Sequence, residues 1–238
     1  MTSSKVVADW VDIASRRSST WWLLSRLVIE QPQDPWLSEL EAVLNTVEAD
    51  SSEPLGPESA ALLSALQQAR GEPDGFTALA VDRTRLLAGV LRNKELCGPY
   101  ESAALGLDMN DDLVVDVAGC YRQAGLTDFG REFGPPDFLG TELRFMSTLV
   151  YQEMVAHKAN DRDLVAQWLD MQRRFLDAHV LNWVPAHCAR MADEAKSAFY
   201  LAVSKLLGAA CELDRRDLEA ILKSTRTAAG ELAGEVRA

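Results

Sequence analysis

The chain has 238 residues, 47% of them hydrophobic, which is enough for a substantial buried core in one large domain or two small ones. The composition therefore excludes the disordered and fibrous classes. The formal net charge of −12 argues against a nucleic-acid partner, because phosphate binding depends on clustered Lys and Arg, and it suits a basic partner instead.

Helical spacing dominates the first half of the sequence. Apolar and small residues recur every three or four positions over residues 7–28 and predict a long first helix, which Pro32 and Pro35 would end. Further helices are expected over residues 35–46, 59–69, 76–91, 102–107 and 111–124, with loops rich in Gly and Pro between several of them. Gly125 stands where the C-terminal cap of the last of these helices would be.

The richest break covers residues 127–137 and is interpreted as a hinge, because it contains Gly130, Gly134, Pro135 and Pro136. Beyond it, helices are expected over residues 138–157, 161–184 and 185–213, followed by the segment 214–238. Alternation with a period of two is nowhere long enough to predict a strand. The sequence thus predicts an all-α single domain of about ten helices, in two sub-bundles of about 1–126 and 138–238 joined by a hinge near 127–137.

We expect neither a membrane span nor an export leader. Charged residues such as Arg26, Glu30 and Arg144 interrupt the strongest apolar segments, which stay short of the roughly 18–20 residues that a bilayer requires. The segment 15–19 superficially resembles a twin-arginine export signal, but its apolar region is cut short, so we interpret it as part of an ordinary first helix. The four cysteines form no CxxC pair and are interpreted as small buried residues. These features predict a cytoplasmic protein.

Motifs of the common enzyme classes are missing from the sequence. It contains no Walker loop, no Rossmann glycine fingerprint, no HExxH and no GxSxG. Glu142, Glu153 and His157 could share one face of a helix, as in a metal site inside a bundle, but the paired Glu-x-x-His pattern of di-iron proteins is absent and solvent-facing side chains are the alternative. We therefore predict no catalytic residue, no metal and no cofactor.

The first segment of the candidate site is Pro99-Tyr100-Glu101-Ser102. Proline starts helices well and glutamate is favoured in the first turn, so the tetrad could be simply a helix start. Alternatively, Tyr100 and Glu101 offer an aromatic face and a carboxylate, a pair suited to gripping an arginine-bearing peptide.

The second segment is Pro135-Pro136-Asp137-Phe138, with Glu142 after three intervening residues. Asp137 could cap the next helix by accepting a hydrogen bond from the amide near Gly140. If the two segments face each other, three carboxylates and an aromatic ring would line one concavity, where guanidinium groups could pair. The candidate binding residues are Pro99, Tyr100, Glu101, Ser102, Pro136, Asp137, Phe138 and Glu142.

Large side chains at helical spacing after the break are interpreted as packing. Trp168, Phe175, Trp183 and Phe199 are expected in the core. His179 is interpreted as a histidine at the edge of the core with a hydrogen-bonded partner.

The order of these segments over about 200 residues resembles the TorD/DmsD family of redox-enzyme maturation proteins. The family's Pro-Tyr-Glu-Ser turn falls on residues 99–102, and its His-Pro-Asp-His signature falls on residues 135–138, where the proline, the aspartate and the later Glu142 match but both histidines are replaced. Residues 82–87 and 121–126, and the later Trp168, His179 and Trp183, are also similar to family segments.

The resemblance implies a cytoplasmic all-helical chaperone that makes and breaks no bonds. It would bind the twin-arginine signal peptide, and with it the precursor, of a molybdenum-containing oxidoreductase, and would hold that enzyme back until its cofactor is inserted. Two other readings stay open: a helical metal- or nucleotide-dependent enzyme, and a scaffold subunit permanently bound to its partner. A Pro/Gly-rich hinge allows either a monomer or a domain-swapped dimer.

Overall fold

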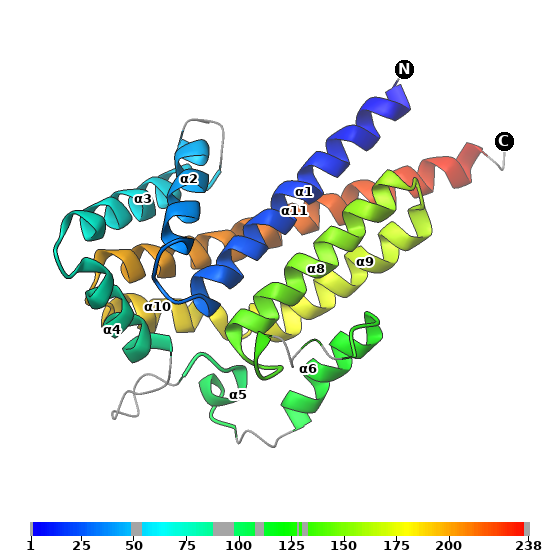
Figure 1. Ribbon diagram of the computed structural model, residues 1–238. Helices are drawn as coiled ribbons and strands as arrows, with labels where there is room; N and C mark the ends of the chain where they lie inside the picture. The colour runs from blue at the N-terminus through cyan, green and yellow to red at the C-terminus, as the bar shows by residue number, and fades with distance from the viewer. Residues whose placement is uncertain are drawn as a thin grey trace.

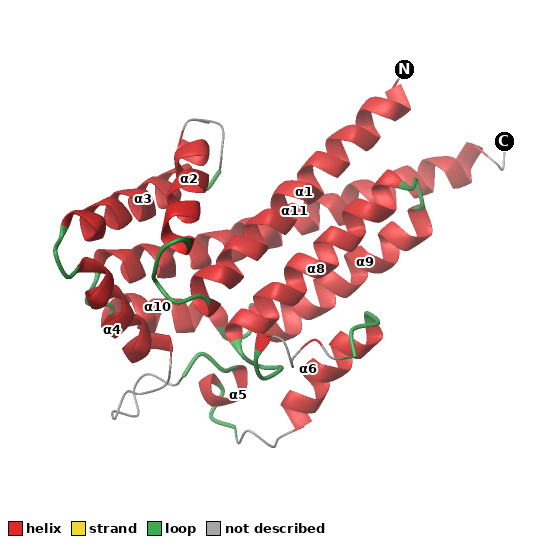
Figure 2. Cartoon of the chain, viewed as in Figure 1, coloured by secondary structure: helices red, strands yellow, loops and turns green. Residues whose placement is uncertain are grey.

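The computed structural model describes residues 2–48, 54–87, 98–107, 112–127, 129 and 133–235. These ranges contain ten α-helices and one π-helix, and Figure 2 shows no strand among them. The predicted all-α fold with about ten helices is therefore confirmed.

The helices before the break follow the predicted pattern closely. They are α1 (Thr2–Ile29), α2 (Trp36–Glu48), α3 (Gly56–Gly71), α4 (Gly75–Leu87), α5 (Glu101–Ala104) and α6 (Asp112–Gln123). The predicted continuation of the fourth helix to residue 91 lies outside the described residues. Part of the predicted hinge also lies outside them, and the hinge stays a prediction.

After the break, α8 (Leu139–Lys158) agrees with the sequence, but two predicted helix boundaries are wrong. The segment 161–184 was expected as one helix, whereas α9 (Arg162–Phe175) gives way to a π-helical turn, η1 (Leu176–Val180). The segment 185–213 is likewise divided between α10 (Val184–Glu194) and α11 (Ala198–Glu235), and α11 runs on past residue 213 without a break.

The boundary between α10 and α11 depends on a residue distant in the sequence. The buried carboxylate of Asp82 accepts hydrogen bonds from the backbone N–H groups of Lys196 and Ser197 and from the Ser197 hydroxyl. Ser197 Oγ in turn accepts from the N–H of Tyr200, at 3.2 Å, in the first turn of α11. These contacts satisfy amides that would otherwise be left unpaired where α11 starts, which explains why local periodicity did not reveal the boundary.

Four long helices, α1, α8, α9 and α11, run side by side through the molecule (Figure 1). α1 packs along α8, α8 along α9, and both α3 and α10 along α11. The core between them is rich in leucine and large aromatic residues such as Trp21, Phe145 and Trp183. Because α1 packs on α8 and α3 on α11, these contacts cross the predicted hinge, and the division into two sub-bundles stays a prediction.

A buried polar cluster ties the four long helices together. Arg17 Nε donates to Asp214 Oδ1 at 2.7 Å, Nη1 donates to Glu153 Oε2 at 3.0 Å, and Nη2 donates to Gln172 Oε1 at 2.8 Å. All four side chains are buried, so this guanidinium supplies compensating charge to both carboxylates, and His157 also lies 3.5 Å from Oε1 of Glu153. Arg17 belongs to the segment that resembled an export signal, and its place within α1 confirms the interpretation as a helix.

Within the described ranges, we find no helix with the length and apolar character that a membrane crossing requires.

Candidate functional site

The two signature segments meet directly in the folded chain. The N–H of Glu101 donates to the carbonyl of Asp137 at 2.9 Å, and the N–H of Leu139 donates to the carbonyl of Pro99 at 2.8 Å. These bonds form an isolated antiparallel bridge between Tyr100 and Phe138, and the centroids of their two rings lie 5.6 Å apart. The turn before α5 and the turn before α8 are thereby joined, and we call this region the signature junction.

Asp137 holds the junction together by a different contact from the expected one. Its Oδ2 accepts from the Ser102 hydroxyl at 2.5 Å and from the Ser102 N–H at 3.3 Å, and both side chains are buried. The expected cap on α8 is wrong, since Phe138 occupies the N-cap position there and no side chain caps that helix. Asp137 instead caps α5, across the junction, by accepting from an amide of its first turn.

Glu101 and Glu142 are fully buried, and each has one oxygen with a partner. Glu101 Oε2 lies 3.0 Å from Nδ1 of His179, and Glu142 Oε2 accepts from the Trp183 indole N–H at 3.1 Å. Both partners come from the segment after α9. The π-helical turn η1 carries His179, and Trp183 is the N-cap residue of α10.

The remaining oxygens of these two glutamates indicate a shared proton. Oε1 of Glu101 and Oε1 of Glu142 are buried, and neither oxygen has a hydrogen-bond partner while both carboxyl groups are ionised. Burial, followed by the charge of Glu101, raises the pKa of Glu142 well above its ordinary value, and the Trp183 bond only partly opposes this effect. A proton on Glu142 lets it donate to Glu101, which satisfies both carboxyl groups and removes one negative charge from the interior.

The expected open concavity is therefore wrong for this conformation. The carboxyl groups of Glu101, Asp137 and Glu142 are brought together as predicted, but they are 0%, 1% and 0% exposed. Tyr100 and Phe138 remain half-buried at the surface above them. The two aromatic rings and Pro136 are thus partly accessible to solvent, while the carboxylates lie beneath them.

Sequence reasoning missed three residues that complete the junction. His179 was correctly expected to have a hydrogen-bonded partner and Trp183 to be buried, but neither was assigned to the site. Tyr121 donates its hydroxyl hydrogen to the carbonyl of Pro136 at 2.6 Å and so fixes the second signature segment to α6. The sequence signal for His179 and Trp183 was their spacing, since these two aromatic residues stand four positions apart on an apolar stripe. The polar ring atoms of such residues usually find hydrogen-bond partners when they are buried.

The alternative metal grouping receives no support from the described residues. Glu153 binds Arg17 and Gln172, whereas Glu142 binds Trp183, so the two carboxylates belong to separate networks. No group of three or more His, Cys, Asp and Glu side chains in the described part of the chain is arranged to hold a metal ion.

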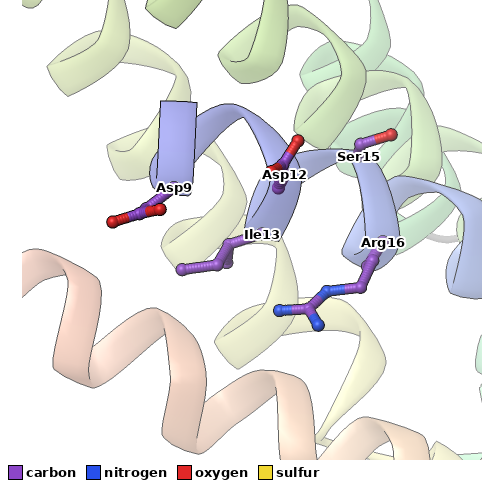
Figure 3. A pocket seen from close by; sticks show the side chains of 5 residues that line it. All are labelled: Asp9, Asp12, Ile13, Ser15 and Arg16. Atoms are coloured by element: carbon purple, nitrogen blue, oxygen red, sulfur yellow. The ribbon is translucent and has the colours of Figure 1, made fainter. Parts of the chain in front are cut away.

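A separate open pocket lies on α1, and Figure 3 shows that Ile13 and Arg16 extend to the same side of the helix there. It is lined by Asp9, Asp12, Ile13, Ser15 and Arg16. Figure 1 places this part of α1 toward the N-terminus, away from α5. None of the predicted binding residues lines it, and the signature junction stays the candidate site.

Comparison with known proteins identifies the family of the chain. The family model described as nitrate reductase delta subunit matches residues 48–189. The chain is 28% identical over 225 residues to the chaperone protein TorD of Aeromonas salmonicida, an alignment that covers 90% of this chain and 96% of that protein. It is 27% identical over 207 residues to the chaperone protein TorD of Vibrio atlanticus, covering 83% of this chain and 92% of that protein. Since the family model spans 142 of the 238 residues, the chain belongs to the nitrate reductase delta subunit family, the TorD/DmsD group that its paired signatures resemble.

Proposed function

We propose that this protein is a cytoplasmic chaperone that binds the twin-arginine signal peptide of a molybdenum-containing oxidoreductase precursor and assists its maturation before export. Similarity to TorD chaperones along nearly the whole chain supports a chaperone rather than an enzyme. The observation that carries the proposal is the meeting of the two signature segments at the bridge between Tyr100 and Phe138.

The surface of the junction suits the apolar part of a signal peptide. Tyr100 and Phe138 are half-buried and in mutual ring contact, so each has an apolar face in the interior and another toward solvent. Pro136 lies next to them and is also half-buried. An apolar peptide segment that covers these groups gains binding free energy from the surface removed from water.

The basic end of the peptide would respond to charge in two ways. The net charge of −12 attracts a cationic peptide and speeds its encounter with the protein. Direct pairing of an arginine with Glu101 or Asp137 requires the bridge between Tyr100 and Phe138 to open, because both carboxylates are buried while it is closed. We therefore propose that the rings bind first and that the carboxylates pair with the peptide after the bridge opens.

Titration of a synthetic twin-arginine signal peptide into the purified protein tests this proposal. Tyr100→Ala should weaken binding by about tenfold, which corresponds to roughly 1.4 kcal/mol. Tyr151→Ala is the matched control, because Tyr151 is a 51% exposed tyrosine on α8 outside the junction. Glu101→Gln combined with Asp137→Asn should weaken binding further and reduce its dependence on salt.

Equal affinity of the unsubstituted chain and all these variants would reject the junction as the binding site. A complex that forms equally well with the mature, exported enzyme would favour the scaffold reading over the chaperone.

A further inference from the structure

The cysteines of the described residues occupy two kinds of environment. Cys188 and Cys211 are buried as expected, and burial raises the pKa of the Cys188 thiol to about 12 and that of Cys211 well above its ordinary value. Cys120, on α6, is only half-buried, which corrects the expectation that it is an ordinary core residue. Cys97 lies outside the described residues. Cys120 is thus the described thiol that a small reagent can approach.

Cys120 stands at the end of a row of three side chains from three elements. Its Sγ is 3.8 Å from Nε2 of His179, which is within hydrogen-bond range for sulfur, and Nδ1 of the same ring is 3.0 Å from Glu101 Oε2. Glu101 is fully buried and the His179 side chain is 4% exposed, so the ring is held in a fixed position. A nucleophile next to a base, with a third group orienting the base, is the arrangement that activates thiols and hydroxyls.

The carboxylate determines which nitrogen of the ring faces the sulfur as an acceptor. Glu101 accepts from Nδ1–H, which leaves the Nε2 lone pair directed toward the thiol. Burial alone would lower the pKa of His179, but hydrogen bonds to Cys120 and Glu101 outweigh that effect and raise it to about 9. With this raised pKa, the ring holds firmly a proton that reaches its Nε2 from the neighbouring Sγ.

One further charged group competes for the same nitrogen. Asp116 Oδ2 lies 3.6 Å from Nε2 of His179, and the Asp116 side chain is 74% exposed. Asp116 precedes Cys120 by one turn of α6, so both can approach the ring from the same helix. Glu142 faces the opposite end of the row through Glu101, and Tyr121 is the next residue after the thiol. Among these groups, removal of the Asp116 charge should direct the ring more completely toward the sulfur.

We propose that Cys120 is a peroxide-reactive modification site, with His179 as its base and Glu101 as a positioning residue. His179 takes the proton from Sγ, and the sulfur attacks one oxygen of a hydroperoxide. The S–O bond forms as the O–O bond breaks, and the departing oxygen takes up the proton and leaves as water or an alcohol. The sulfur is oxidised by two electrons to a sulfenic acid, and the hydroperoxide is reduced by two.

The site goes beyond the proposed chaperone function, because nothing in the recognition of a peptide requires a reactive thiol. It is connected to the signature junction through Glu101, which belongs to both. Oxidation of Cys120 adds an oxygen atom between α6 and the ring of His179, where the two now lie in contact.

The test is hydrogen peroxide treatment of the full chain carrying Cys97→Ser, with dimedone to trap sulfenic acid and peptide mass spectrometry to locate it. Cys120 should be labelled at least about tenfold faster than Cys188 or Cys211. His179→Gln should slow labelling of Cys120 by about tenfold or more, because the base is lost. Asp116→Asn should leave the rate at least as high as before.

His157→Gln is the matched control, since His157 is a histidine on α8 that pairs with Glu153 and stacks on Trp10, away from this row. Equal slowing by His157→Gln and His179→Gln would overturn the proposal. If His179→Gln does not fold, the chain that keeps His179 provides the test. Equal rates of Cys120 labelling in its native and urea-unfolded states would overturn the proposal. None of these readouts uses peptide binding, so their failure is separate from a failure of the proposed chaperone function.

Discussion

His179 Nδ1 lies 3.0 Å from Glu101 Oε2 and joins the π-helical turn η1 to α5. Both side chains are buried, so the ion pair is shielded from solvent and each charge depends on the other. This contact links the first signature segment to a part of the chain 78 residues later. A π-helical turn changes the direction of the side chains that follow it, and such turns are frequent at functional sites.

The raised pKa of His179 predicts how stability depends on alkaline pH. The group binds its proton more tightly in the folded chain, with a pKa of about 9, than in the unfolded chain, near 6.5. Its contribution is therefore complete below about pH 6.5 and is lost as the pH rises to about 9. Urea unfolding at a series of pH values should show this decline, and His179→Gln should flatten it. An unchanged slope in the variant would assign the decline to other groups.

The sequence was informative wherever local rules decide the structure. Prolines and apolar periodicity located α1, α2 and α8 to within a few residues, and the order of the two signatures identified the family. The prediction of helix boundaries failed where a side chain distant in the sequence determines them. At Ser197, for example, Asp82 accepts a backbone hydrogen bond and so fixes the start of α11.

The two signature segments meet in the structure, but their carboxylates are buried and not exposed as expected, and the assignment of these residues to peptide binding stays a prediction. The sequence does contain both turns, and it is the backbone bridge between Tyr100 and Phe138 that brings them together. The burial of Glu101 and Glu142 depends on His179 and Trp183, which arrive from a turn whose π-helical geometry has no simple sequence signature. Pairwise contacts of this kind cannot be read from spacing along one chain.

Glu142→Gln tests whether a proton is shared in the interior. The pKa of Glu142 is raised in the folded chain, so its stabilising effect is complete below its ordinary value of 4.5 and is lost as the pH rises through the folded value. Glutamine keeps the shape and can donate to Glu101 without titrating. We expect the variant to gain stability relative to the unsubstituted chain as the pH increases above 4.5, measured by urea unfolding. A variant that instead loses stability at every pH would show that Glu142 is charged.

Arg17→Met should be strongly destabilising. The substitution removes the arginine that pairs with the buried carboxylates of both Glu153 and Asp214, and breaking a buried pair in this way typically costs about 3–5 kcal/mol. Chemical denaturation followed by circular dichroism measures the change. The matched control is Arg215→Met, since Arg215 pairs with Glu212 and Glu219 on the solvent side of α11 and its loss should hardly move the midpoint. Similar losses in both variants would contradict a special role for the buried cluster.

Gly140→Ala tests how closely α1 packs against the start of α8, directly beside the signature junction. A Cβ atom at position 140 would lie 2.5 Å from Cγ1 of Ile29 and 2.7 Å from Cε1 of Phe138, so both side chains must shift. The carbonyl of Gly140 also accepts from the Ser25 hydroxyl at 3.0 Å, which fixes α1 at this position. Overpacking of this kind costs about 1–3 kcal/mol.

The same substitution at Gly119, in α6, supplies the control for Gly140→Ala. Its Cβ would meet Arg122 Nη2 at 3.7 Å, an ordinary contact, so alanine there should stabilise the helix by roughly 0.5–1 kcal/mol. Thermal unfolding of the two variants should therefore shift in opposite directions. Because Phe138 is displaced only in Gly140→Ala, that variant should also bind the signal peptide more weakly, whereas Gly119→Ala should bind it normally. Normal peptide binding by a folded Gly140→Ala protein would mean that the position of the Phe138 ring is unimportant for recognition.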